Sequence, residues 1–129
     1  EFAAWSMTSI AGRRIDEYCS GPHFDKAKIL EEVRNSAYHI IDYKGSTYFA
    51  VGLALPRIAG AILRNEHSIL SVSMTLDGEF GLKDVCLSVP CIVGRSGAER
   101  VIESDLPADE QAALEASAKR LKEAFTEMN

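Results

Sequence analysis

The sequence predicts an α+β fold in which two long consecutive central helices, an antiparallel β-meander and a carboxy-terminal helix form one domain, residues 1–129. Two changes of apolar period carry this prediction. Apolar residues recur at spacings of three and four from Ile29 to Ile41 and again after Pro107, which is typical of helices, and the apolar run that follows Lys44 suits a helix that is apolar all round. From Ser68 onward the apolar period changes to two, which is typical of strands.

Composition excludes several classes of protein. A content of 47% hydrophobic and 26% charged residues is ordinary for a globular domain, and a net charge of −5 argues against a nucleic-acid partner. The uncharged run between Lys44 and Arg57 is shorter than the roughly 18 apolar residues that span a bilayer, so no membrane segment is expected. Cys19, Cys86 and Cys91 have no CxxC spacing and no completed metal-ligand set, so we expect reduced, structural thiols in a cytoplasmic protein, with Cys86 and Cys91 on opposite faces of a strand.

The first elements follow from local signals. The opening residues 1–15 are expected to form an extended strand that stops at residues 12–14, followed by a loop over residues 18–23. Asp25 is placed to cap the first long helix, which should run to about Tyr43 with one side facing solvent. Its expected apolar stripe consists of Ile29, Val33, Ala37, Ile40 and Ile41.

The second long helix differs in character from the first. Gly45 can end the first helix, Ser46 or Thr47 can cap the second, and the second should continue to about residues 64–65. Its apolar residues point in all directions, which predicts a buried core helix. Pro56 lies inside it and removes a hydrogen bond, so a kink or a local 3₁₀ or π turn is expected near Gly52 to Pro56.

Three short strands and a helix complete the expected chain. Alternation predicts strands over residues 70–76 and 85–89, joined by a turn that begins at Asp77–Gly78. A second turn at residues 94–97 leads to a polar strand over residues 98–104, which suits a sheet edge. Pro107 starts the last helix, which should dock by an apolar stripe consisting of Leu114, Ala118, Leu121, Phe125 and Met128.

The residues alone do not assemble a complete active site. His23, His39 and His67 are most simply solvated or capping histidines, and the adjacent carboxylates at residues 31–32 and 109–110 are most simply solvated helix faces. The sequence contains no Gly-rich phosphate loop after a strand, no HExxH and no GxSxG. Small hydroxyl residues interrupt an apolar region at residues 44–47, where Thr47 reads more readily as a helix cap than as a ligand-binding group.

Four segments in register nevertheless carry a resemblance that covers essentially the whole chain. They are EFAAWSMTSIAG, VRNSAYHIIDYKGSTYFAVGLAL, LDGEFGLKDVCLSVP with the following IVGRSG, and LPADEQAALEASAKRLKEAF. Together they resemble the carboxy-terminal half of bacterial-type L-lactate dehydrogenases of the lactate/malate dehydrogenase family.

The resemblance implies hydride transfer between NAD and C2 of lactate or pyruvate, with proton transfer by a histidine. In that family the opening segment follows a G-E-H-G-D motif, completed by Ser or Thr, whose His is the acid/base. The nucleotide-binding domain, that His, its Asp partner and the substrate-binding Arg would then all precede residue 1. We therefore expect no catalytic residue among the 129 residues and no activity from the chain alone.

The same resemblance implies which residues of this chain would line the site. Thr47 matches the threonine of a K-G-x-T hinge beside the substrate, and Val51 matches an aliphatic residue that packs on the nicotinamide ring. Val51 is expected one helical turn after Thr47, so both should face the same side. Ser36 and Ala37 match a small pair that sets the size of the substrate pocket. Pro56 departs from the family pattern and leaves the course of the second helix open.

Two classes of function remain open. The first is the substrate-side half of an NAD-dependent L-lactate dehydrogenase, a cytoplasmic homo-oligomer (dimer or tetramer) acting on a small 2-hydroxy or 2-oxo acid, with malate or another L-2-hydroxy acid as alternative substrate. The second is a free-standing, non-catalytic binding or assembly module. The enzyme half predicts exposed apolar surface where other domains and subunits dock, whereas the module predicts a monodisperse soluble domain.

Overall fold

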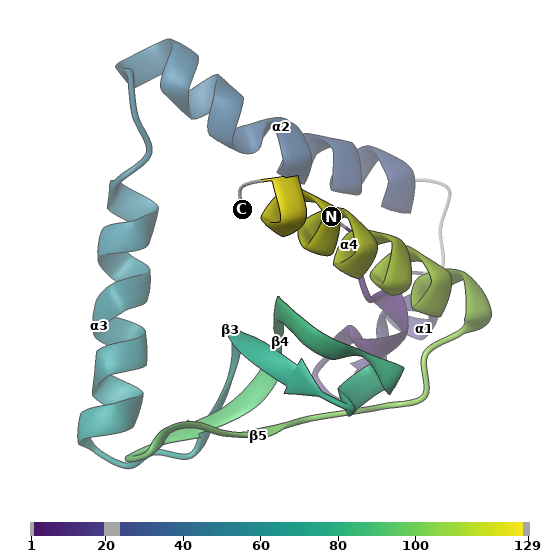
Figure 1. The fold of residues 1–129 in the computed structure, drawn as a ribbon. Helices are drawn as coiled ribbons and strands as arrows, with labels where there is room; N and C mark the ends of the chain where they lie inside the picture. Colours follow the sequence, from purple (N-terminus) through teal and green to yellow (C-terminus); the bar gives the residue numbers. More distant parts are fainter. Residues whose placement is uncertain (1, 20–23, 128–129) are drawn as a thin grey trace. The chain divides into compact units, whose positions relative to one another are not determined.

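The computed structural model describes residues 2–19 and 24–127 of the chain (Figure 1). The chain divides into two compact units, one formed by Glu1–Thr47 with Asp105–Ser117 and the other by Tyr48–Ser104 with Ala118–Asn129. Along the chain the elements are η1 (Trp5–Met7), β1 (Ser9–Ile10), β2 (Arg13–Arg14), α1 (Ile15–Tyr18), α2 (Lys26–Lys44), α3 (Phe49–Leu63), β3 (Ser68–Asp77), η2 (Glu79–Gly81), β4 (Lys83–Gly94), β5 (Gly97–Val101) and α4 (Ala108–Glu127). None of the helices in these described ranges is both long enough and apolar enough to cross a membrane.

The opening of the chain is a turn and a hairpin, and the prediction of one extended strand was wrong. A 3₁₀ turn, η1, precedes the two short antiparallel strands β1 and β2. Between these strands the backbone adopts φ of 51° at Ala11 and 79° at Gly12, so the chain reverses over two residues. The mixed apolar and polar residues of this segment gave no clear signal of that reversal.

Side-chain contacts hold the opening turn within the first unit. The Ser6 amide donates to Glu110 Oε1 at 2.9 Å, and the Ser6 hydroxyl donates to Glu110 Oε2 at 2.5 Å. The Trp5 ring meets Phe24 edge-on with ring centroids 6.1 Å apart, and Lys26 Nζ lies 5.8 Å from the Trp5 ring centroid. The Glu110 carboxylate therefore connects the first turn of α4 to η1, a link between residues 104 positions apart.

Both ends of α2 follow their local sequence signals. The Asp25 side chain accepts a hydrogen bond from the Lys28 amide at 3.0 Å, which confirms the predicted N-cap. At the other end Gly45 has φ of 82° and its amide donates to the Ile41 carbonyl at 2.7 Å, which confirms the predicted stop. No residue of α2 is buried, so the apolar stripe that local spacing predicts is left largely uncovered.

The start of α3 differs from prediction, and at Pro56 the helix type does not change, so the expected kink stays a prediction. Tyr48 is the N-cap and forms no side-chain capping bond, so the predicted cap by Ser46 or Thr47 was wrong. The helix remains α-helical from Phe49 to Leu63 with Pro56 inside it, and the predicted local 3₁₀ or π turn is not formed. The bond that proline cannot donate is lost without a change of helix type.

The prediction that the second long helix is a buried core helix was also wrong. Only Gly60 and Ala61 of α3 are buried, and Leu53 is 78% exposed. A helix that is apolar on all sides is suited to burial, but this pattern does not tell whether another segment packs against it. The other exposed apolar side chains at and along α3 are Tyr48, Phe49, Val51, Leu55 and Leu63.

The predicted antiparallel meander is confirmed in the second unit. The sheet has the order β3-β4-β5, with Leu76 opposite Val85 and a register shift between Leu76 and Asp77. Strand β5 lies at an edge as predicted, although it is shorter than expected. Alternate residues of β4 are buried, and together with Leu76 of β3 they form much of the hydrophobic core: Leu76, Val85, Leu87, Val89, Cys91 and Val93.

Helix α4 buries only part of its predicted stripe. Leu114 and Ala118 are buried, whereas Leu121 and Phe125 are exposed. Met128, the last member of that stripe, lies outside the described residues. The prediction that α4 docks along its whole stripe therefore holds only for the earlier turns.

Candidate functional site

Ser36 and Ala37 lie side by side on α2 and are both exposed. The Ser36 hydroxyl donates to the Val33 carbonyl at 2.7 Å, a back-bond within the helix. This bond turns the hydroxyl toward its own backbone. In the structure Ser36 and Ala37 therefore both act as small side chains, and neither presents a free polar group.

Thr47 lies in the segment between the two long helices, and Val51 lies in the first turn of α3. Because α3 begins at Phe49, Thr47 precedes the helix, and the expectation that the two residues lie one helical turn apart was wrong. Thr47 is exposed, and its hydroxyl has no hydrogen-bond partner among the described residues. It is therefore able to donate to, or accept from, a ligand without first breaking an internal bond.

The surroundings of Val51 suit a flat apolar group. Its side chain is 53% exposed. A Cβ built on the neighbouring Gly52 would meet no heavy atom within 4 Å, so the surface beside Val51 is open. An exposed aliphatic side chain beside an open glycine can pack against a flat group.

The histidines and cysteines do not build a nucleophilic or metal site in residues 2–19 and 24–127, which contain no group of three or more His, Cys, Asp or Glu able to hold a metal ion. His39 is exposed on α2, whereas His67 Nε2 lies 3.4 Å from Glu99 Oε2; His23 lies outside the described residues. The Glu99 carboxylate is therefore the neighbour of His67, and no hydrogen bond or ion pair joins the His39 side chain to another described residue.

The three cysteines are free thiols. Cys86 is exposed and Cys91 is buried, which confirms that they occupy opposite faces of β4. Burial, with a smaller contribution from the charge of Glu79, raises the pKa of the Cys91 thiol. The raised pKa disfavours the thiolate, and Cys91 Sγ contacts Met74 Sδ at 3.3 Å within the core, so its role is structural.

The strongest charge cluster joins the end of α3 to the start of β3. Glu66 accepts hydrogen bonds from Arg57 Nη1 at 2.5 Å, Arg64 Nε at 2.8 Å and Ser68 Oγ at 3.0 Å. These bonds, the one from Arg57 first, lower the pKa of Glu66 from its ordinary value of 4.5 to about 2. Because both guanidinium groups converge on one carboxylate, the cluster supports the helix-to-strand junction and leaves no unpaired base for chemistry.

The lowered pKa of Glu66 should make the free energy of unfolding depend on pH at acidic pH. A folded-state pKa below the unfolded value contributes stability that is fully present above about pH 4.5 and is lost as the pH falls through about 2. Glu66→Gln should therefore lower the urea midpoint of the chain most at neutral pH, and the difference from wild type should shrink between these two pH values. The measurement is a series of urea unfolding curves at stepped pH.

The matched control for this series is Glu31→Gln, which removes a carboxylate of α2 that forms no ion pair with any described residue. It should leave the acid dependence unchanged. A difference between Glu66→Gln and wild type that stays constant from neutral pH to pH 2 would show that the cluster does not hold the Glu66 charge.

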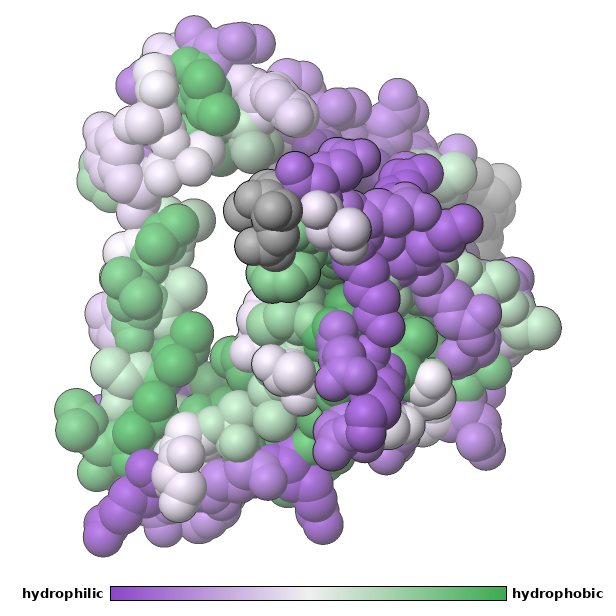
Figure 2. All heavy atoms as spheres, viewed as in Figure 1, coloured by the Kyte–Doolittle hydropathy of each residue, from purple (hydrophilic) through white to green (hydrophobic). Residues whose placement is uncertain are grey.

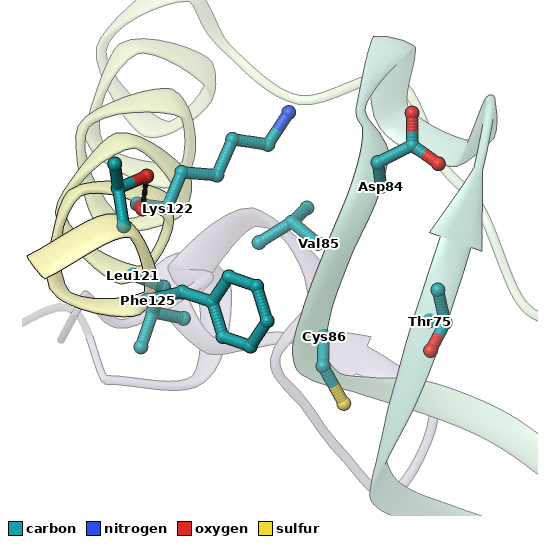
Figure 3. Close-up of a pocket in the computed structure, with 8 residues that line it drawn as sticks. Thr75, Asp84, Val85, Cys86, Leu121, Lys122 and Phe125 are labelled. Carbon is teal, nitrogen blue, oxygen red and sulfur yellow. Dashed lines mark hydrogen bonds between the residues drawn. The ribbon is translucent and has the colours of Figure 1, made fainter. Parts of the chain in front are cut away.

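A cavity of about 670 Å³ lies within the second unit, between the start of β4 and the last turns of α4 (Figure 3). Val85 and the Phe125 ring point toward each other across it (Figure 3). Lys122 Nζ donates to the Lys83 carbonyl at 2.6 Å. The full lining is Thr75, Asp84, Val85, Cys86, Leu121, Lys122, Phe125 and Thr126. None of the site residues that the sequence implied belongs to this lining.

Sequence reasoning missed both the Glu66 cluster and this cavity. In the sequence, nothing distinguishes Arg57, Arg64 and Glu66 from ordinary charged surface residues. Only the turn from α3 into β3 brings them together. The sequence did contain one signal of the cavity, because Leu121 and Phe125 continue the apolar stripe of α4. That pattern indicated an apolar surface, but not that it would stay open.

Comparison with known proteins supplies a family for these elements. A family model described as the lactate/malate dehydrogenase alpha/beta C-terminal domain matches residues 1–129. The L-lactate dehydrogenase of Treponema denticola is 94% identical over 135 aligned residues, which cover 100% of this chain and 43% of that protein. L-lactate dehydrogenase 1 of Clostridium acetobutylicum is 50% identical over 130 residues, which cover 97% of this chain and 42% of that protein.

A solved structure agrees with these sequence matches. The crystal structure of the minor L-lactate dehydrogenase from Enterococcus mundtii, in a ligand-bound form, has a TM-score of 0.89 and 36% identity to this chain. The match covers 98% of this chain and 42% of the other. The chain thus spans less than half the length of the relatives that it matches. Because the family match extends over all 129 residues, the chain belongs to the lactate/malate dehydrogenase family and corresponds to its alpha/beta C-terminal domain.

Proposed function

We propose that in the intact protein this chain forms the substrate-side half of an NAD-dependent L-lactate dehydrogenase that interconverts L-lactate and pyruvate. The observation that carries the proposal is the 94% identity, over the whole chain, to the L-lactate dehydrogenase of Treponema denticola. The relative from Clostridium acetobutylicum is also an L-lactate dehydrogenase, which favours lactate over malate or another L-2-hydroxy acid.

In this proposal the chain contributes one wall of the substrate site. The unpartnered hydroxyl of Thr47 binds a polar group of the substrate, and the small residues Ser36 and Ala37 leave room for the substrate's C3 group. Positioning of this kind lowers the barrier by holding the reacting carbon in line with the hydride donor. The four implied residues carry no acid or base. The family resemblance implies that proton exchange at the substrate oxygen belongs to a histidine that precedes these residues.

Val51 is the residue of this chain that we assign to the cofactor. NAD, when bound, would supply the hydride acceptor for C2 of lactate, and NADH the hydride donor for pyruvate. The exposed Val51 side chain and the open surface at Gly52 would pack against one face of the nicotinamide and help to fix its orientation. This contact excludes water from that face of the ring.

Exposed apolar surface favours an enzyme half over a free-standing module. Figure 2 shows hydrophobic side chains gathered over α3, the helix at the left of Figure 1, and six of them at and along that helix are exposed large apolar residues. A self-sufficient soluble domain rarely leaves such a helix uncovered. We infer that in the intact protein other domains and sister subunits cover it, as in a cytoplasmic homo-oligomer, a dimer or tetramer.

The test of the function is a steady-state assay of the intact protein with NADH and a panel of 2-oxo acids. We expect kcat/KM to be higher for pyruvate than for oxaloacetate and for 2-oxo acids with longer chains. Higher kcat/KM for oxaloacetate would identify a malate dehydrogenase instead. An absence of turnover with every acid would favour the binding module.

The matched control for this assay is a preparation of residues 1–129 alone, verified by intact mass. It should show no turnover under the same conditions, because the proposal places proton transfer outside these residues. Turnover by that preparation would contradict the proposal that proton transfer is carried out by a residue outside this chain.

A further inference from the structure

We draw no further inference here: the strongest candidate, the cavity between the start of β4 and the last turns of α4, carries side chains of opposite charge at Asp84 and Lys122, and nothing in the structure shows what covers its apolar wall.

Discussion

Leu76→Ala should lower the free energy of unfolding of the chain by about 2 to 5 kcal/mol. Leu76 is 0% exposed and is one of the three largest fully buried side chains. It lies opposite Val85 at the end of the regular β3–β4 pairing, just before the register shift at Asp77. Truncation removes buried methyl groups and leaves a cavity that the paired backbones cannot close. The lost burial energy of the methyl groups and the cost of the cavity therefore add. The measurement is urea unfolding followed by circular dichroism, with the midpoint falling and the slope unchanged.

Two variants separate core packing from a general effect of mutation. Leu76→Met keeps most of the volume and should cost less than about 1.5 kcal/mol. Ile69→Ala shortens a side chain of the same strand that is 64% exposed, so it should change stability much less than Leu76→Ala does. A loss below about 1 kcal/mol for Leu76→Ala would mean that the neighbouring side chains collapse into the space.

Thr47→Val, made in the intact enzyme, should lower kcat/KM for pyruvate by about 5- to 150-fold, which corresponds to about 1 to 3 kcal/mol of barrier. Valine has nearly the shape of threonine but cannot form a hydrogen bond. The Thr47 hydroxyl has no partner among the described residues, so its removal breaks no internal bond of the described chain. The loss should therefore appear in kinetics with little change in the thermal midpoint.

Two controls show whether the hydroxyl itself matters. Thr47→Ser retains the hydroxyl and should keep kcat/KM within a few-fold of wild type, whereas Ser46→Ala removes the neighbouring hydroxyl and should have little effect. Because the loss of a contact made equally in the ground state and the transition state raises KM alone, an equal fall in kcat and kcat/KM would place the contact in the transition state. An unchanged kcat/KM in Thr47→Val would remove Thr47 from the substrate site.

Local signals predicted many element types and several boundaries well. The Asp25 cap, the Gly45 stop and the alternation of β3 with β4 depend on residues within a few positions of each other. Local signals failed at Ala11, where a non-glycine residue adopts φ of 51°, and at Thr47, which precedes the helix it was expected to cap. In both places the backbone conformation is only weakly encoded by residue type.

The candidate site was predictable only through resemblance. Ser36, Ala37, Thr47 and Val51 have no feature of composition or spacing that marks them as functional. Their assignment rests on the family pattern, and the structure adds that the Thr47 hydroxyl lacks a described partner while the Ser36 hydroxyl is bonded to its own helix. The proposal assigns proton transfer to a residue outside this chain, and the four residues named here contribute only walls of the site.

The sequence by itself determined the α+β class, the order of the long elements and the family, because periodicity, caps and motifs are properties of short segments. Only the tertiary structure decided which apolar residues are buried: β4 hides Val89 and Val93, whereas α3 exposes Leu53. The physical reason is that burial depends on segments distant along the chain, which must be present and packed against a surface before it leaves water. The convergence of Arg57 and Arg64 on Glu66 was decided in the same way, by the path of the chain from α3 into β3.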